Sequence, residues 1–274
     1  MVKSIIGLLI GIAVSEGVVR SVDDEAERYV PGFEGSEYGK TPIRHLLHMA
    51  SGVDFGEDRD GGRDLELLWH DMVVGSVFGL GPRKGTVQSL IQFNRRATPS
   101  GQRFFYASIE PDVLGVVLRS ALRSSLSDYL GDKIWRPIGA EADATWVLDA
   151  KGAEIAHFGF SAVLRDYGRL GRLLAWDGAW NNQQIIPPQW MIDATTVRAT
   201  DAHLAPGRAT PWLGYGYLVW LLPGPRRQFA FIGQNGQRLC IDPAAKLVMV
   251  QTALDDTPEF WGLWASVVTQ FGRG

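Results

Sequence analysis

The first apolar segment of the chain is hydrophobic on every side of the helix that it predicts. From Ile5 to Val14 it contains only Ile, Leu, Val, Ala and Gly, whereas a surface helix would carry a polar face. The run is too short to span a bilayer. Gly7 and Gly11 lie four residues apart, and small residues at that spacing let another element approach the helix closely. We therefore expect a buried central helix here.

The same segment also has features of a secretory signal peptide. Lys3 precedes the apolar run, and Ala13-Val14-Ser15 imitates a small-residue cleavage site. Glu16 and Arg20 follow that site at a spacing that continues the helix, which favours the buried helix over the signal peptide. A cytoplasmic location is accordingly preferred, with a secreted or periplasmic protein as the alternative.

Apolar residues recur every three or four positions through the middle of the chain, which predicts amphipathic helices. The clearest of them are residues 111–122, 126–135 and 161–176, and a further helix is expected at 65–77. Residues 53–64 are polar and rich in glycine, and they predict a loop.

In the last quarter of the chain the pattern changes from helical to alternating. Strands are predicted at residues 215–220, 229–232, 238–241 and 247–251, separated by tight turns. Short strands joined in this way favour an antiparallel meander. Residues 258–271 predict a closing helix with one apolar stripe that would cover the sheet.

Composition and charge narrow the choice of partners. The 274 residues are 46% hydrophobic and 21% charged, with a net charge of −3, which is typical of a globular protein. Nothing in this balance attracts phosphate backbones, so we expect no nucleic acid partner. Cys240 is the one cysteine, so no intrachain disulfide can form, and it is expected to pack in a strand. The oligomeric state stays open.

Lys3 is placed to be the last residue of a Ser-x-x-Lys motif whose serine would directly precede Met1. A serine hydroxyl needs a nearby base, and a lysine three residues later on a helix lies on the same face. A buried lysine loses affinity for its proton and can act as that base. The alternative is an ordinary terminal lysine in water, and Lys3 alone does not decide between the two.

Two further segments could contribute to the same chemistry. Tyr106-Ala107-Ser108 follows a glycine turn, and a tyrosine beside a lysine can relay a proton. Residues 233–237 (GQNGQ) lie between two predicted strands, and their glycines would let a ligand approach backbone N–H groups. The alternatives are a buried aromatic residue and a plain hairpin turn.

Other kinds of site find little support in the sequence. His45 and His48 are three residues apart, but no His-Glu-x-x-His motif or cysteine pair accompanies them, so packed histidines are expected and no metal. The sequence contains no Gly-x-Ser-x-Gly elbow and no phosphate-binding loop. We expect no cofactor.

Taken together and in order, these segments resemble the serine β-lactamase and penicillin-recognising superfamily, in particular its class C-like branch of esterases and 6-aminohexanoate-dimer hydrolase. The motifs of that superfamily are Ser-x-x-Lys, Tyr/Ser-x-Asn/Ser and a Lys-Thr-Gly-type element. The resemblance covers nearly the whole chain. It rests on residues 1–17, 41–55, 99–118, 129–146, 159–191, 214–220 and 232–250.

The resemblance implies roles for individual residues. Lys3 would be the motif lysine and Tyr106 the catalytic tyrosine, with Ser108 two residues later as a substrate-binding group. Gln234-Asn235-Gly236 would stand at the Lys-Thr-Gly position and bind substrate. The backbone N–H of Gln237 would stabilise the oxyanion. Gln234 lacks the cation that normally pairs with a penicillin carboxylate, which weakens the case for penicillin recognition.

The fold that the resemblance implies is a single β-lactamase/transpeptidase-like domain over residues 1–274, of the α/β (α+β) class. Residues 1–20 and 206–274 would form an α/β region with an antiparallel sheet flanked by helices. Residues 21–205 would form a large inserted helical region. The strands that the family carries before its Ser-x-x-Lys motif would be missing, as in a chain truncated through that motif.

The implied function is that of a serine hydrolase, which cleaves small-molecule carboxylic esters or amides through an acyl-enzyme. Because the nucleophilic serine would precede Met1, we expect little or no hydrolysis by the chain as printed. A wrongly assigned internal start codon or a truncated gene would each explain the pattern. The alternative is a catalytically degenerate relative that binds acyl or peptide ligands without cleaving them.

Overall fold

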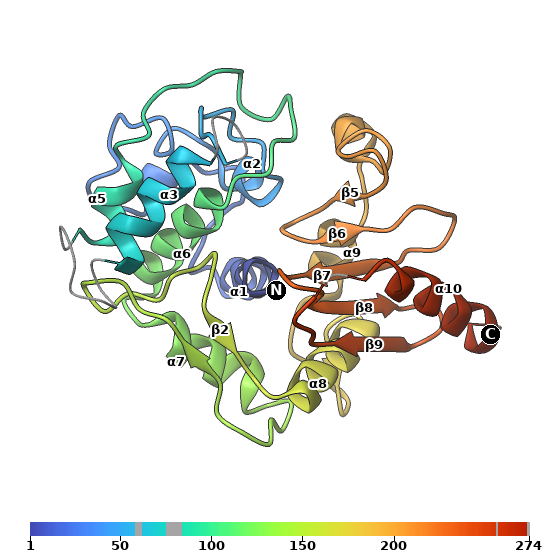
Figure 1. Ribbon diagram of the computed structural model, residues 1–274. Helices are drawn as coiled ribbons and strands as arrows, with labels where there is room; N and C mark the ends of the chain where they lie inside the picture. Colours follow the sequence, from blue (N-terminus) through green and yellow to red (C-terminus); the bar gives the residue numbers. More distant parts are fainter. Residues whose placement is uncertain (58–61, 75–83, 256, 273–274) are drawn as a thin grey trace.

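The computed structural model describes residues 1–57, 62–74, 84–255 and 257–272. Within these residues, a mostly helical part and a five-stranded sheet stand side by side, and helix α1 (Val2–Ser15) runs between them (Figure 1). No helix of the described residues is long and apolar enough to cross a membrane.

Helix α1 is buried over almost its entire length, as its all-round hydrophobicity predicts. A Cβ atom on Gly7 would lie 2.7 Å from the carbonyl oxygen of Tyr217, and one on Gly11 would overlap the ring of Trp190. The indole N–H of Trp190, from helix α9 (Pro188–Thr195), donates to the carbonyl oxygen of Gly7 at 3.1 Å. The expectation that the two glycines admit a close neighbour is therefore confirmed.

The helical part is built around α6 (Ile109–Leu122), which packs against α1 and three short helices. Its other helices are α2 (Ile43–Leu47), α3 (Arg63–Trp69), α5 (Thr86–Leu90) and α7 (Leu126–Leu130). Short 3-10 turns lie at Ala26–Arg28 and Ala199–Leu204, and π-turns at His70–Val74 and Gly131–Trp135. The helix expected at 65–77 is thus α3 followed by a π-turn, and its last three positions lie outside the described residues.

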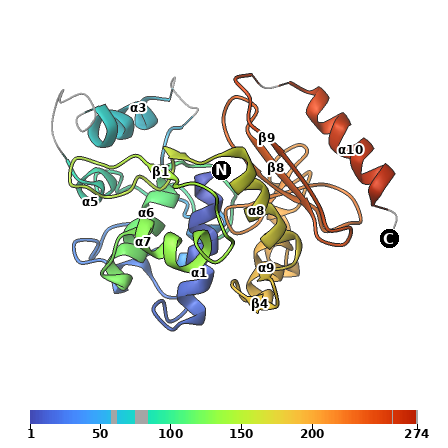
Figure 2. The ribbon, with the colours of Figure 1, turned by 90° about the horizontal axis from the view of Figure 1, so that it is seen from below.

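The sheet is an antiparallel meander in which each strand pairs with the next along the chain. Its strands are β5 (Gly214–Tyr215), β6 (Trp220–Leu221), β7 (Phe229–Ile232), β8 (Arg238–Asp242) and β9 (Leu247–Gln251). Helix α8 (Leu164–Ala175) packs on one face and α10 (Glu259–Phe271) on the other (Figure 2). The predicted fold class, an antiparallel sheet flanked by helices, is confirmed, as is the packed position of Cys240 in β8.

The single strand predicted at 215–220 is wrong, because the chain turns sharply in its middle. Leu218 has a φ of 56°, and this turn separates β5 from β6. The backbone N–H groups of the turn are bound outside the sheet: that of Tyr217 to Ala194 at 3.1 Å and that of Leu218 to Leu47 at 2.8 Å. Every side chain from Tyr215 to Val219 is buried, so the alternation of residue types carries no information about faces here.

The division of the domain at residues 20 and 205 stays a prediction. Helix α8 falls inside the range assigned to the helical region, yet it packs against β8 and β9. A Cβ atom on Gly171 would lie 2.4 Å from Val248, which shows how closely helix and sheet approach. Two small hairpins complete the fold, formed by β1 (Thr145–Trp146) with β2 (Phe160–Ser161) and by β3 (Ala179–Trp180) with β4 (Gln183–Gln184).

Candidate active site

Lys3 lies at the start of α1, where the helix emerges between the two parts of the molecule. Its side chain is half-buried, and Nζ donates a hydrogen bond to the carbonyl oxygen of His157 at 3.1 Å. Nζ also lies 5.4 Å from the centre of the Tyr106 ring, which is within the range of a cation–π contact. The structure therefore brings Lys3 and Tyr106 together from positions more than a hundred residues apart in the sequence.

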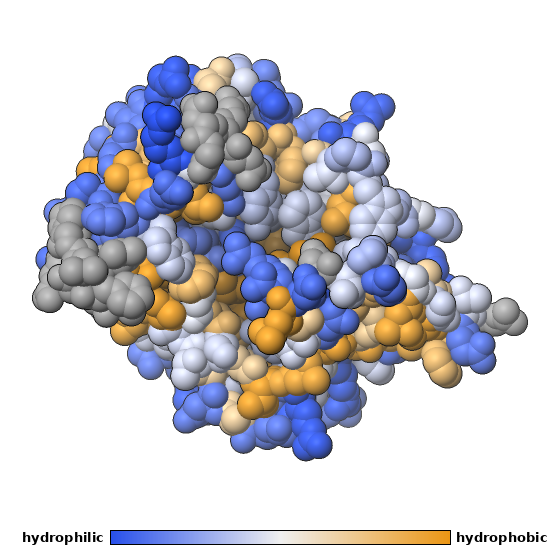
Figure 3. All heavy atoms as spheres, viewed as in Figure 1, coloured by the Kyte–Doolittle hydropathy of each residue, from blue (hydrophilic) through white to orange (hydrophobic). Residues whose placement is uncertain are grey.

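Tyr106 is held by aromatic neighbours from the sheet. Its ring stacks on that of Trp220 with centres 5.4 Å apart and an interplanar angle of 21°. The ring of Tyr215 meets it edge-on, with centres 6.2 Å apart. These contacts give one side of the site an apolar wall, and space-filling atoms show the surface hollowed between the helical part and the sheet (Figure 3).

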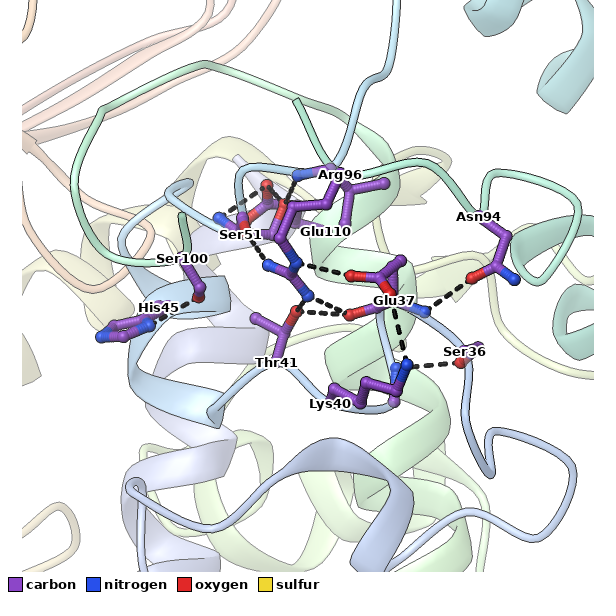
Figure 4. Close-up of polar contacts among 12 residues, drawn as sticks. Ser36, Glu37, Lys40, Thr41, His45, Ser51, Asn94, Arg96, Ser100 and Glu110 are labelled. Atoms are coloured by element: carbon purple, nitrogen blue, oxygen red, sulfur yellow. Dashed lines mark hydrogen bonds and ion pairs between the residues drawn. The ribbon is translucent and has the colours of Figure 1, made fainter. Parts of the chain in front are cut away.

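A polar network centred on Arg96 lies in the helical part (Figure 4), and the segment before Tyr106 is bound to the turn that this network holds in place. The N–H of Phe105 donates to the carbonyl oxygen of Met49 at 2.8 Å, in the turn after α2. Arg96 braces this turn by binding the carbonyl oxygen of Ser51 and the side chains of Glu37 and Thr41. The network thus fixes the approach of the chain to the tyrosine.

A buried carboxyl group belongs to the same network. Glu110 accepts a hydrogen bond from the hydroxyl of Ser51 at 2.6 Å, and burial raises the pKa of Glu110 to about 8. A carboxyl group with a pKa near 8 is mostly protonated at neutral pH. Glu110 is the second residue of α6, so this carboxyl group comes two residues after Ser108 in the chain.

The turn between β7 and β8 forms the third side of the site. The backbone nitrogen of Met1 lies 3.5 Å from the carbonyl oxygen of Ile232, the last residue of β7. Gln234 and Asn235 are exposed, and Asn235 and Gly236 adopt φ angles of 54° and 74°. Gly236 is required here because a Cβ atom would lie 2.2 Å from the carbonyl oxygen of Asp255.

The backbone N–H of Gln237 closes this turn. It donates to the carbonyl oxygen of Gln234 at 3.3 Å, and the N–H of Gly233 donates to the carbonyl oxygen of Gln237 at 2.9 Å. An oxyanion would have to compete with the first of these bonds, which is the longer and weaker one. The role of Gln237 as an oxyanion donor stays a prediction.

Ser108 is bound within the protein. Its hydroxyl donates to the carboxylate of Glu57 at 2.6 Å, and its backbone N–H donates to the same side chain. This carboxylate therefore caps the N-terminus of α6, where the helix dipole favours negative charge. Glu57 belongs to the loop predicted at 53–64, and no sequence pattern marked it.

Ser4 follows the motif lysine, but the structure does not present it to the site. The residue is 4% exposed, and its hydroxyl donates to the carbonyl oxygen of Leu218 at 2.6 Å. A buried hydroxyl committed to a backbone carbonyl is not available to attack a substrate. Ser4 therefore serves to join α1 to the turn between β5 and β6.

Of the two histidines predicted to be packed, His48 is buried and His45 is half-buried. His48 is buried against Tyr217 with ring centres 4.9 Å apart, and burial lowers the pKa of His48 to about 3. His45 binds the hydroxyl of Ser100 at 2.6 Å. In the part of the chain that the structure describes, no three His, Cys, Asp or Glu side chains are grouped to hold a metal ion.

A pocket of about 470 Å³ lies elsewhere, between α5 and α6. The carboxylates of its lining are bound within the protein: Asp149 accepts from the backbone N–H of Thr86 at 2.7 Å, and Arg119 pairs with Glu154 at 2.7 Å. Neither Lys3 nor Tyr106 lines it, so we place the chemistry at the Lys3 site despite the pocket's size.

Comparison with known proteins identifies the family of the chain. The Beta-lactamase family model matches residues 1–261. The chain belongs to the β-lactamase family. It is 26% identical to 6-aminohexanoate-dimer hydrolase of Paenarthrobacter ureafaciens, over 99% of this chain and 70% of that protein.

Solved structures of this β-lactamase fold extend the comparison. A Bacillus anthracis protein named for 6-aminohexanoate-dimer hydrolase superposes with a TM-score of 0.83 and 25% identity, over 98% of this chain and 70% of its own. A penicillin-binding protein from Bacillus halodurans superposes with a TM-score of 0.70 and 16% identity, over 98% of this chain and 83% of its own. The second likeness shows the fold alone.

Proposed function

We propose that this member of the β-lactamase family is built to hydrolyse small carboxylic esters or amides through a serine acyl-enzyme. The observation that carries the proposal is the meeting of Lys3 with Tyr106 at the start of α1, beside the end of β7. The serine would stand directly before Met1. There it would lie one helical turn from Lys3 on the same face of α1.

In the proposed reaction, the serine oxygen attacks the substrate carbonyl carbon while Lys3 accepts the serine proton. The negative charge on the carbonyl oxygen is stabilised by backbone N–H groups, those of the serine and of Gln237. Tyr106 passes the proton to the leaving alcohol or amine, the C–O or C–N bond breaks, and water then cleaves the acyl-enzyme.

The surroundings of the site favour small, partly apolar substrates over penicillins. The stacked rings of Tyr106 and Trp220 offer an apolar wall to an acyl chain. Gln234 is uncharged, so it supplies no cation for a substrate carboxylate. The relative from Paenarthrobacter ureafaciens is named for hydrolysis of a 6-aminohexanoate dimer, which is consistent with an amide substrate.

One observation favours the second candidate, a relative that binds such ligands without cleaving them. The N–H of Gln237 closes its own turn at 3.3 Å and is not held open for an oxyanion. Binding without that donor would leave the carbonyl unactivated, so ligand affinity would persist without turnover.

The test compares residues 1–274 with a chain extended at its N-terminus so that a serine directly precedes Met1. We expect the extended chain to hydrolyse p-nitrophenyl esters. Residues 1–274 alone should hydrolyse them at a rate lower by several orders of magnitude. Lys3→Ala and Tyr106→Phe in the extended chain should each reduce kcat/KM by about 10²-fold or more.

Lys246→Ala provides a matched control, because Lys246 also donates to a backbone carbonyl, that of Ala175 at 2.9 Å, and lies over the ring of Trp176. It should leave the rate unchanged. Hydrolysis that survives Lys3→Ala would overturn the proposed mechanism. Ester or amide binding by the extended chain without any turnover would support the binding candidate.

A further inference from the structure

Asp112 is a fully buried carboxylate one turn into α6, and it holds a loop that reaches Lys3. One of its oxygens accepts the backbone N–H groups of Ala156 at 2.8 Å and His157 at 3.1 Å. The other oxygen lies 2.6 Å from Nδ1 of His157. Three donors from two consecutive residues thus meet one carboxylate, which fixes both the backbone and the imidazole of His157.

The far side of this clamped segment faces Lys3. The carbonyl oxygen of His157 accepts the hydrogen bond from Lys3 Nζ at 3.1 Å. The side chains of Asp112 and His157 are 0% and 5% exposed, so water does not compete for their bond. The carboxylate therefore sets the position of the carbonyl that in turn holds the lysine.

We propose that Asp112 and His157 are positioning residues for Lys3, an inference that rests on the proposed role of Lys3 as the base. A lysine that accepts a proton must aim the lone pair of Nζ at the serine hydroxyl. A carbonyl acceptor at a fixed place binds one N–H of the neutral amine and so orients that lone pair. If the loop shifts by about 1 Å, the alignment is lost, and the cost in rate reaches about 10²-fold.

Substitution of Asp112 separates the two kinds of bond that it makes. In Asp112→Asn the amide oxygen can still accept the two backbone N–H groups, but the amide NH2 then faces the Nδ1–H of His157. The imidazole must change its tautomer or move. In His157→Gln the imidazole bond is lost, while the carbonyl that holds Lys3 remains.

Asp166→Asn is the matched control. Asp166 is likewise a fully buried helix carboxylate, on α8, and it accepts the backbone N–H groups of Glu141 at 2.9 Å and Ala142 at 3.2 Å. Its loop does not contain the residue that binds Lys3. Both Asp166→Asn and Asp112→Asn should therefore lower the stability of the protein. Only Asp112→Asn should change the behaviour of Lys3.

The first measurement uses residues 1–274 and needs no turnover. Trace acetylation with acetic anhydride, followed by peptide mass spectrometry, reports the reactivity of each lysine. We expect Asp112→Asn to raise the labelling rate of Lys3 relative to that of Lys246 by about threefold or more, because the bond to the carbonyl is weakened. Asp166→Asn should leave this ratio unchanged. Equal ratios in the two variants would overturn the positioning role.

The second measurement uses the serine-bearing extended chain. Asp112→Asn and His157→Gln should each lower kcat for p-nitrophenyl acetate by about tenfold or more with KM nearly constant, because the lysine acts in the transition state. A change confined to KM, or an equal loss in Asp166→Asn, would contradict the inference. Complete inactivity of the extended chain itself would count against the proposed function, while the labelling ratio would still decide the positioning of Lys3.

Discussion

At the scale of the residue, Glu110 couples the stability of the protein to pH. Its folded-state pKa of about 8 lies above 4.5, the ordinary pKa of a glutamate side chain. Between these values the folded chain holds a proton that the unfolded chain releases. The stabilising contribution is therefore fully present below pH 4.5 and is lost as pH rises through 8.

Glu110→Gln tests this dependence. Glutamine keeps an acceptor for the hydroxyl of Ser51 and cannot ionise, so the variant should gain free energy of unfolding relative to the native chain as pH rises from about 5 to about 9. The gain is at most about 1.4 kcal/mol for each pH unit. Urea denaturation across this range measures it, with the exposed Glu25→Gln as the control. A difference that does not change with pH would refute the account.

The two residues assigned to the proposed chemistry, Lys3 and Tyr106, could be singled out from the sequence because each stands at a motif position of the family that the chain resembles. Their meeting at 5.4 Å is what the structure adds. His157 could not be foreseen, since it binds Lys3 through a backbone carbonyl and every residue type has one. The role of Glu57 could not be foreseen either, because the polar, glycine-rich composition of its segment predicts only a loop.

At the scale of the element, α1 acts as a spacer between the two parts of the molecule. Its glycines let the Tyr217 backbone and the Trp190 ring come into contact with the helix. An alanine would normally favour a helix over glycine by about 1 kcal/mol. Here the added methyl group would push against a backbone carbonyl oxygen, and the helix start that carries Lys3 would have to shift.

We expect Gly7→Ala to destabilise the protein by about 1–3 kcal/mol, the usual cost of overpacking a core. Gly168→Ala on α8 makes the same change where no atom lies within 4 Å, and it should stabilise by up to about 1 kcal/mol. Chemical denaturation of both variants measures the difference. If both substitutions were stabilising, the close approach at α1 would not exist in solution.

The last three strands of the meander, β7 to β9, could be predicted almost to the residue, because the turns between them contain Asn-Gly and Asp-Pro pairs and their runs are short. The prediction from the sequence failed at the turn between β5 and β6, where the chain is buried on both sides. In the β5–β6 turn, the bonds of Tyr217 and Leu218 to Ala194 and Leu47 decide the path of the chain. Such long-range partners leave no local pattern.

At the scale of the whole molecule, the site lies where α1, the start of α6 and the β7–β8 turn converge (Figure 1). The family resemblance could foresee these segments because it compares the entire chain and not a single motif. The packing of α8 against the sheet was not foreseen, since an amphipathic helix shows that it has a buried face but not what covers that face.

The central claim is that Lys3 and Tyr106 serve a serine placed directly before Met1. The most direct measurement is intact-mass spectrometry of the extended chain, quenched in acid after brief exposure to p-nitrophenyl acetate. The account predicts one acetyl group, located by peptide mapping on that serine, and greatly reduced acetylation of it in Lys3→Ala. Ester turnover with the serine unmodified, or equal acetylation of the serine in Lys3→Ala, would contradict it.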